Sequence, residues 1–224
     1  MLVPSPFASE ILFTIGPVPI AASVVTTWGI MAALSLTCWL GTRRARREGG
    51  LLQSSLEVVV QMLSDQIAEI LRRPAEPFLP LLGSLFIFLV AANLSAIVPA
   101  ATPPTAHLET PAALALTVFS SVHFFGIRTL GLGAYLKNYL RPSPLMLPVN
   151  LLAEITRTFS LTVRLFGNIM SHELVIGLVL ALAGLLVPVP LMVLGVLIGL
   201  VQAYIFTTLA TVFVGGAVGA AEKG

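Results

Sequence analysis

Long apolar runs, separated by short polar or proline-rich segments, are the feature that most constrains how this chain can fold. Its 224 residues are 57% hydrophobic and only 10% charged, and the mean hydropathy is +0.98. A water-soluble domain carries roughly 25% charged residues. Because the apolar residues form long runs with no polar face for solvent, the sequence predicts an all-α, polytopic membrane protein.

The first part of the chain divides into spans and connections by length. Crossing ~30 Å of hydrocarbon takes about 20 apolar residues in a helix. On this basis we expect an external N-terminal segment 1–23, a first span 24–41, an amphipathic helix 52–73, a second span 77–98 and a rather short third span 112–127.

The segment 52–73 differs from the spans in its pattern of apolar and polar residues. Its apolar residues recur at helical spacing, at Leu56, Val59, Leu63, Ile67 and Ile70. The opposite face carries Glu57, Gln61, Asp65 and Glu69. This pattern predicts a helix that lies on the membrane surface or against a partner and does not cross the bilayer.

The last part of the chain is too long for upright spans. Residues 145–187 and 190–221 would form helices of ~64 Å and ~47 Å at 1.5 Å per residue. Both exceed the hydrocarbon thickness, so we expect them to be strongly tilted or broken and joined by a turn at residues 188–190. The whole chain, 1–224, is then a single membrane domain with about five inserted helices and one surface helix.

The basic residues predict the orientation. Ten of the twelve Lys and Arg residues fall on one side of this topology: Arg43, Arg44, Arg46, Arg47, Arg72, Arg73, Arg128, Lys137, Arg141 and Lys223. Basic residues collect on the cytoplasmic side of membrane proteins. We therefore expect the N-terminus outside and the C-terminus in the cytoplasm.

The other two basic residues, Arg157 and Arg164, lie inside an apolar helix. At 100° per residue they share a stripe ~27 Å long with other polar residues. Its members are Glu154, Arg157, Arg164, Asn168, Ser171 and His172. Glu154 and Arg157 are close enough in sequence to pair. Arg164 has no carboxylate three or four positions away, and a central arginine costs at least ~2.5–3.5 kcal/mol on insertion scales, so its compensation must come from elsewhere.

Three motifs in the last part resemble a known family. Residues 160–174 read Ser-Leu-Thr-Val-Arg-Leu-Phe-Gly-Asn-Ile-Met-Ser-His-Glu-Leu, and residues 201–206 read Val-Gln-Ala-Tyr-Ile-Phe. Upstream, Pro-Val-Asn at 148–150 is followed by Glu154. These segments closely resemble the signature of subunit a of F-type ATP synthases. The detailed resemblance covers residues 148–213, and the first half resembles the family in layout.

The resemblance implies a tilted helix pair that curves along a rotating ring of c subunits. Protons, or sodium ions in some relatives, would enter one aqueous half-channel, ride on ring carboxylates and leave through a second half-channel. Arg164 would be the essential residue, with Gln202 as its neighbour on the last helix. Asn168, His172, Glu173 and Gln202 would line the external half-channel, and Glu154 would belong to the exit path. Family members vary at His172 and Gly195, and here His172 would supply the ionisable group.

The partners implied are the c-ring, the b subunits of the peripheral stalk, the F1 sector indirectly and the lipid bilayer, with no nucleic acid. We find no nucleotide-binding loop, metal-ligand cluster or nucleophile triad, so we expect no cofactor and no catalytic residue in the chain itself. The expected location is a bacterial inner membrane, with a plastid thylakoid as the alternative. A secondary transporter or channel is the rival function, and His123 could line a channel or be a hydrogen-bonded structural residue.

Overall fold

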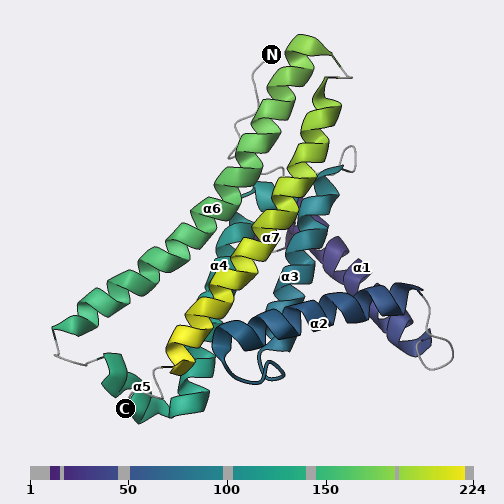
Figure 1. Ribbon diagram of the computed structural model, residues 1–224. Helices are drawn as coiled ribbons and strands as arrows, with labels where there is room; N and C mark the ends of the chain where they lie inside the picture. The colour runs from purple at the N-terminus through teal and green to yellow at the C-terminus, as the bar shows by residue number, and fades with distance from the viewer. Residues whose placement is uncertain are drawn as a thin grey trace.

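The computed structural model describes residues 11–15, 18–44, 51–97, 103–139, 145–184 and 187–219. Within them lie seven α-helices, drawn in Figure 1: α1 Ala22–Arg44, α2 Leu51–Leu71, α3 Leu79–Leu94, α4 Glu109–Leu130, α5 Leu132–Tyr139, α6 Met146–Ala183 and α7 Pro188–Gly219. Two 3-10 turns, η1 Ser95–Ile97 and η2 Pro104–Ala106, flank the α3–α4 connection. Ahead of α1, β1 Ile11–Ile15 and β2 Val18–Ala21 form an antiparallel hairpin.

The apolar helices confirm the expected all-α membrane fold. Four helical segments are long and apolar enough to cross a bilayer: Ala22–Leu40, Glu109–Leu130, Met146–Leu182 and Pro188–Gly219. Helix α3 is apolar but shorter, with 16 residues. Helix α4 is longer than the predicted third span, because its first turn includes Pro111, and proline is tolerated there.

Helix α2 is amphipathic, as the sequence predicted. Leu63 and Ile67 on its apolar face are only 3% and 1% exposed. Its four polar positions opposite that face, from Glu57 to Glu69, are all exposed. Figure 1 shows α2 crossing the lower part of the molecule, where it packs against α3 and α7. Gln66 Nε2 also donates a hydrogen bond of 2.7 Å to Thr208 Oγ1 of α7. The chain itself therefore covers the apolar face of α2.

The last two helices form the long hairpin that the sequence predicted, and each is continuous. With 38 and 32 residues, α6 and α7 measure ~57 Å and ~48 Å. In Figure 1 their upper parts run side by side and reach beyond the other helices, and toward the lower end the two helices diverge. Since neither helix is broken, tilt is what would fit them into a bilayer.

The predicted turn at residues 188–190 is wrong. Helix α7 begins at Pro188, and both Pro188 and Pro190 lie in its first turn, where a missing N–H costs nothing. Helix α6 instead ends at Ala183, and Gly184 follows with φ +77°. This left-handed conformation favours glycine and ends the helix.

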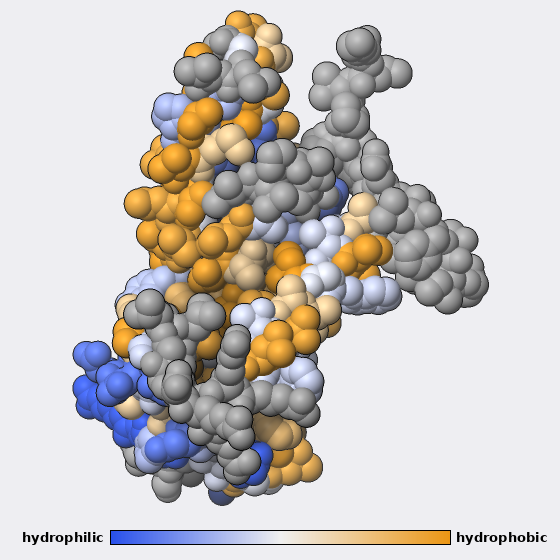
Figure 2. All heavy atoms as spheres, turned by 90° about the vertical axis from the view of Figure 1, so that its right-hand side faces the viewer, coloured by the Kyte–Doolittle hydropathy of each residue, from blue (hydrophilic) through white to orange (hydrophobic). Residues whose placement is uncertain are grey.

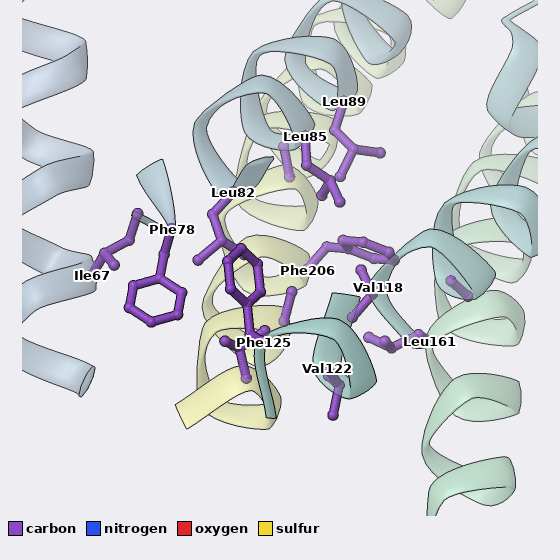
Figure 3. Close-up of a cluster of buried hydrophobic side chains, with 14 of the residues drawn as sticks. Ile67, Phe78, Leu82, Leu85, Leu89, Val118, Val122, Phe125, Leu161 and Phe206 are labelled. Carbon is purple, nitrogen blue, oxygen red and sulfur yellow. The ribbon is translucent and has the colours of Figure 1, made fainter. Parts of the chain in front are cut away.

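The core lies where α3, α4 and α7 meet, with contributions from α2 and α6. Figure 3 shows its buried side chains: Ile67, Phe78, Leu82, Leu85, Leu89, Val118, Val122, Phe125, Leu161 and Phe206. The rings of Phe78 and Phe125 lie 4.8 Å apart. Between membrane helices such contacts stabilise mainly through close packing. The small residues Gly199, Ala203 and Ala210 are buried on α7 and let its neighbours approach.

Sequence analysis missed three features: the β1–β2 hairpin, helix α5 in the predicted polar connection, and the folded-in loop between α3 and α4. In that loop Thr105 of η2 is fully buried. Helix α5 packs on α4 through Tyr135, whose ring fills the space that a Cβ at Gly126 would need. Figure 2 shows hydrophilic residues gathered at the lower end of the molecule and mostly apolar residues above them.

Candidate functional site

A cavity of about 290 Å³ opens between the upper halves of α6 and α7. Three predicted site residues line it from α6: Asn168, His172 and Glu173. Gly195 and Gly199 line it from α7, and Asn93 lines it from α3. The cavity thus brings together most of the residues assigned by resemblance to the external half-channel.

His172 and Gly195 occupy complementary positions across this cavity. The imidazole of His172 fills the space where a Cβ at Gly195 would stand. A bulky side chain can therefore project from only one of these two positions. This contact gives a physical reason for the expectation that the ionisable group resides at His172 in this chain.

Asn168 and Gln202 join the two helices below the cavity. Asn168 Nδ2 lies 3.5 Å from Gln202 Oε1 and donates a long hydrogen bond. The Gln202 side chain is 5% exposed, and its Nε2 has no hydrogen-bond partner among the described residues. A buried donor without a partner costs about 1–3 kcal/mol, so this site suits a water molecule or a partner group. Gln202 itself does not line the upper cavity.

Arg164 lies one helical turn below Asn168 and points away from the chain's own core. It is exposed, whereas Leu161 and Leu165 on either side of it are 3% and 0% exposed. In the part of the chain that the structure describes, no carboxylate lies within ion-pair distance of Arg164, and it makes no hydrogen bond to Gln202.

A second cavity of about 240 Å³ lies beside Arg164, on the lower half of the pair. Its polar lining consists of Thr156, Arg157, Ser160 and Arg164. The guanidinium carbon of Arg157 lies 5.4 Å from the centre of the Phe213 ring, a cation–π contact that helps a charged group in an apolar helix. Two permanent positive charges thus line this cavity.

Antiparallel packing of α6 on α7 explains this arrangement. Arg157 meets Phe213, and Asn168 meets Gln202. The two α6 residues are eleven positions apart, as are the two α7 residues, so the helices keep one register over ~16 Å. Arg157, Asn168 and Gln202, which span 45 positions of the sequence, are thereby aligned along a single seam.

Glu154 has a partner that the sequence did not predict. Its Oε2 lies 3.3 Å from Nε2 of His123 on α4. Glu154 is ten residues from Arg164, or ~15 Å along the helix axis, so the structure does not bring these two together. The available signal was that both apolar helices contain ionisable residues, but sequence alone does not show which helices pack.

Asn93 is a buried polar residue in the apolar helix α3, and we expect such a residue to form internal hydrogen bonds. It is 6% exposed, and its Nδ2 donates to the Gly199 carbonyl oxygen at 2.7 Å. Thr105 Oγ1 donates to Asn93 Oδ1 at 3.3 Å. The Asn93 side chain also occupies the space that a Cβ at Gly199 would need. This network fixes α3 and η2 to α7 at the wall of the upper cavity.

The sequence is similar to those of known proteins. The family model described as ATP synthase A chain matches residues 24–215. The chain is 60% identical over 220 residues to "ATP synthase subunit a 2" of Bradyrhizobium sp., covering 98% of this chain and 99% of that protein.

Two further relatives show slightly lower coverage and lower identity. The chain is 48% identical over 214 residues to "ATP synthase subunit a 2" of Pelobacter propionicus, covering 96% and 94% of the two chains. It is 42% identical over 221 residues to "ATP synthase subunit a" of Legionella pneumophila, covering 96% and 94%. These bacterial relatives, the matched family model and the apolar helices show that this multi-pass membrane protein belongs to the ATP synthase subunit a family.

Proposed function

We propose that this chain is the ion-conducting stator subunit of a rotary F-type ATP synthase in a bacterial inner membrane. It provides two aqueous half-channels and the essential Arg164, which carry protons or sodium ions to and from carboxylates of a c-ring. Ion flow is thereby coupled to rotation and to ATP synthesis or hydrolysis. The chain itself catalyses no reaction on ATP.

The observation that carries this proposal is the placement of Arg164. It is exposed between two separate cavities and has no carboxylate partner among the described residues. A guanidinium inside a membrane needs a counter-charge or water. A rotor carboxylate passing along α6 would supply that counter-charge.

The residue types support distinct roles for the two cavities. In the upper cavity, His172 and Glu173 can each bind and release a proton, and Asn168 and Gln202 continue the polar path toward Arg164. Arg164 stays charged and cannot relay a proton. It favours the ionised form of a ring carboxylate, promotes ion release, and separates the two half-channels electrostatically.

The proposed surroundings follow from the same assignment. The c-ring faces the exposed side of α6, the b subunits of the peripheral stalk hold the chain in place, and the F1 sector connects through them. The helix ends that carry Arg72, Arg73, Arg128 and Lys137 face the cytoplasm, because basic residues collect there. The N-terminus lies outside.

Reconstitution tests this function against the rival one. Vesicles that contain only this chain should show no ion flux above the lipid background, whereas vesicles with the assembled complex should pump ions when ATP is added. A secondary transporter would carry ions alone. Coupled flux by the isolated chain, without a c-ring, would contradict the proposed function.

A further inference from the structure

A second ionisable pair lies apart from the upper cavity, in the lower half of the molecule. His123 of α4 and Glu154 of α6 are 3.3 Å apart, Nε2 to Oε2. Their side chains are 31% and 14% exposed. Two ionisable groups in contact between apolar helices are costly unless they serve each other or a function.

The hydrogen bonding of His123 fixes the position of one ring proton. Nδ1 lies 2.9 Å from the carbonyl oxygen of Phe119, one turn earlier on α4. A carbonyl oxygen has no hydrogen to donate, so Nδ1 must carry the proton of this bond. The Phe119 ring, 4.4 Å from the imidazole, and the Tyr135 ring, 6.0 Å away, flank the histidine and hold its plane.

The contact with Glu154 then requires a second proton. At 3.3 Å the two atoms are within ion-pair distance without an aligned hydrogen bond, and if both were unprotonated, two acceptors would face each other and repel. One proton between them resolves this, either on His123 as imidazolium beside a carboxylate, or on Glu154 as a carboxylic acid that donates to Nε2. Both forms have zero net charge, and loss of that proton leaves the pair with a charge of −1.

We propose that His123 and Glu154 hold one exchangeable proton between them and form a relay on the exit path. This rests on the proposed function of the chain. A proton released near Arg164 reaches Glu154 through water along the lower cavity and restores the neutral pair. The more exposed His123 passes the proton to water on the cytoplasmic side, and the pair returns to −1. His123 is thus the relay partner, and the ion leaving here is a proton.

The surrounding charges are consistent with a pair whose net charge cycles between 0 and −1. Arg157 lies one turn from Glu154 on α6, and Arg128 follows five residues after His123 on α4, with its guanidinium carbon 6.0 Å from the Phe124 ring centre. Helix α5 contributes Tyr135 and Lys137, and the described part of α7 contributes only Tyr204 as a titratable group. Among the described residues, the permanent charges named here are all positive, opposite in sign to the pair after it has lost its proton.

The test compares variants of the assembled complex in vesicles, with assembly checked by co-purification of the c-ring. His123→Gln keeps a donor to Glu154 but cannot exchange a proton. We expect ATP-driven proton pumping to fall about tenfold, the modest end of what a positioned acid or base contributes, and its dependence on cytoplasmic pH to flatten. His107→Gln, a histidine outside both cavities, should leave pumping and its pH profile unchanged.

Two further measurements separate a relay from a structural contact. Added imidazole should restore pumping in His123→Ala, because removal of the histidine ring leaves space for it. It should not restore pumping in His123→Gln. Glu154→Gln should lower pumping as well, and the double variant with His123→Gln should be no worse than the stronger single variant. Normal pumping by assembled His123→Gln would overturn the relay, as would strictly additive effects.

The outcomes distinguish failure of the relay from failure of the proposed function. If the wild-type complex takes up radioactive sodium in place of protons, the relay is wrong and the role as stator subunit stands. If Arg164→Ala abolishes pumping while His123→Gln pumps normally, again only the relay is lost. If the assembled Arg164→Ala complex pumps normally, the proposed function itself is contradicted.

Discussion

The two cavities along α6 and α7 differ in the kind of polar group that lines them. The upper one contains groups that can gain and lose protons, His172 and Glu173. The lower one contains two guanidinium groups, Arg157 and Arg164, whose charge is permanent. One register of the same helix pair produces both cavities, so the difference comes from residue type and not from backbone geometry. A group that exchanges protons and a fixed positive charge can thus lie within a few turns of each other on one helix pair.

The largest effect is expected at Arg164, the boundary between the cavities. Arg164→Ala removes the fixed charge that separates them, so ATP-driven pumping and synthesis should fall on the order of 100-fold or more, as for loss of a key electrostatic group. Passive ion leak through the assembled complex should rise. Arg164→Lys should also lose pumping and synthesis, because the compact ammonium group of lysine does not replace the planar guanidinium group of arginine. Pumping by vesicles, with c-ring co-purification as the assembly check, measures both.

A smaller effect is expected from removing the titratable group of the upper cavity. His172→Ala leaves Glu173 and Asn168 in place, so transport should slow roughly tenfold and its dependence on external pH should shift. The complex should still assemble, because His172 contributes nothing to the buried core cluster. An unchanged pH profile would contradict the assignment of a titratable role to the upper cavity.

The contact between His172 and Gly195 predicts a steric effect in the same cavity. Gly195→Ala places a methyl group where the imidazole lies and must displace it, at an overpacking cost of about 1–3 kcal/mol. Transport should fall several-fold and approach that of His172→Ala. Gly216→Ala on the same helix meets no neighbouring atom within 4 Å and is the matched control. Equal activity of the two alanine variants would contradict the packing seen here.

We expect water access to distinguish the cavity from its surroundings, and labelling measures this without requiring activity. In a Cys38→Ser background, single cysteines at Asn168 and His172 should react with small aqueous thiol reagents added from outside. A cysteine at the buried Gln202 should react more slowly, and one at Leu174, which is 53% exposed but outside the cavity, should be inert in the membrane. Reaction at Leu174 as fast as at His172 would mean that no separate aqueous path exists.

The smallest perturbation tests which cavity faces which side. Leu108, just before α4, is 48% exposed, and Lys137 on α5 is exposed at the other end of α4. Cysteines at these positions, again with Cys38→Ser, should label from the outside and the cytoplasmic side of sealed vesicles respectively, with normal pumping. Labelling of both from one side would reverse or abolish the proposed orientation.

The sequence by itself determined the membrane class, the amphipathic α2 and the long final hairpin. These follow from local properties, because apolar run length and helical periodicity depend only on neighbouring residues. It also singled out Arg164, since the absence of a nearby carboxylate on the same helix can be read from spacing alone. The turn at residues 188–190 was predicted wrongly, because proline can start a helix as well as end one.

Only the tertiary structure decided which distant residues meet. Three contacts join residues of different helices: Asn168 with Gln202, His172 with Gly195, and His123 with Glu154. Periodicity gives the face of a helix but not the neighbour against which it packs or the register of that packing. The neighbour and the register depend on side-chain volumes across the whole bundle, which no local sequence pattern contains. For example, the glycines of α7 leave the space into which Asn93 and His172 project.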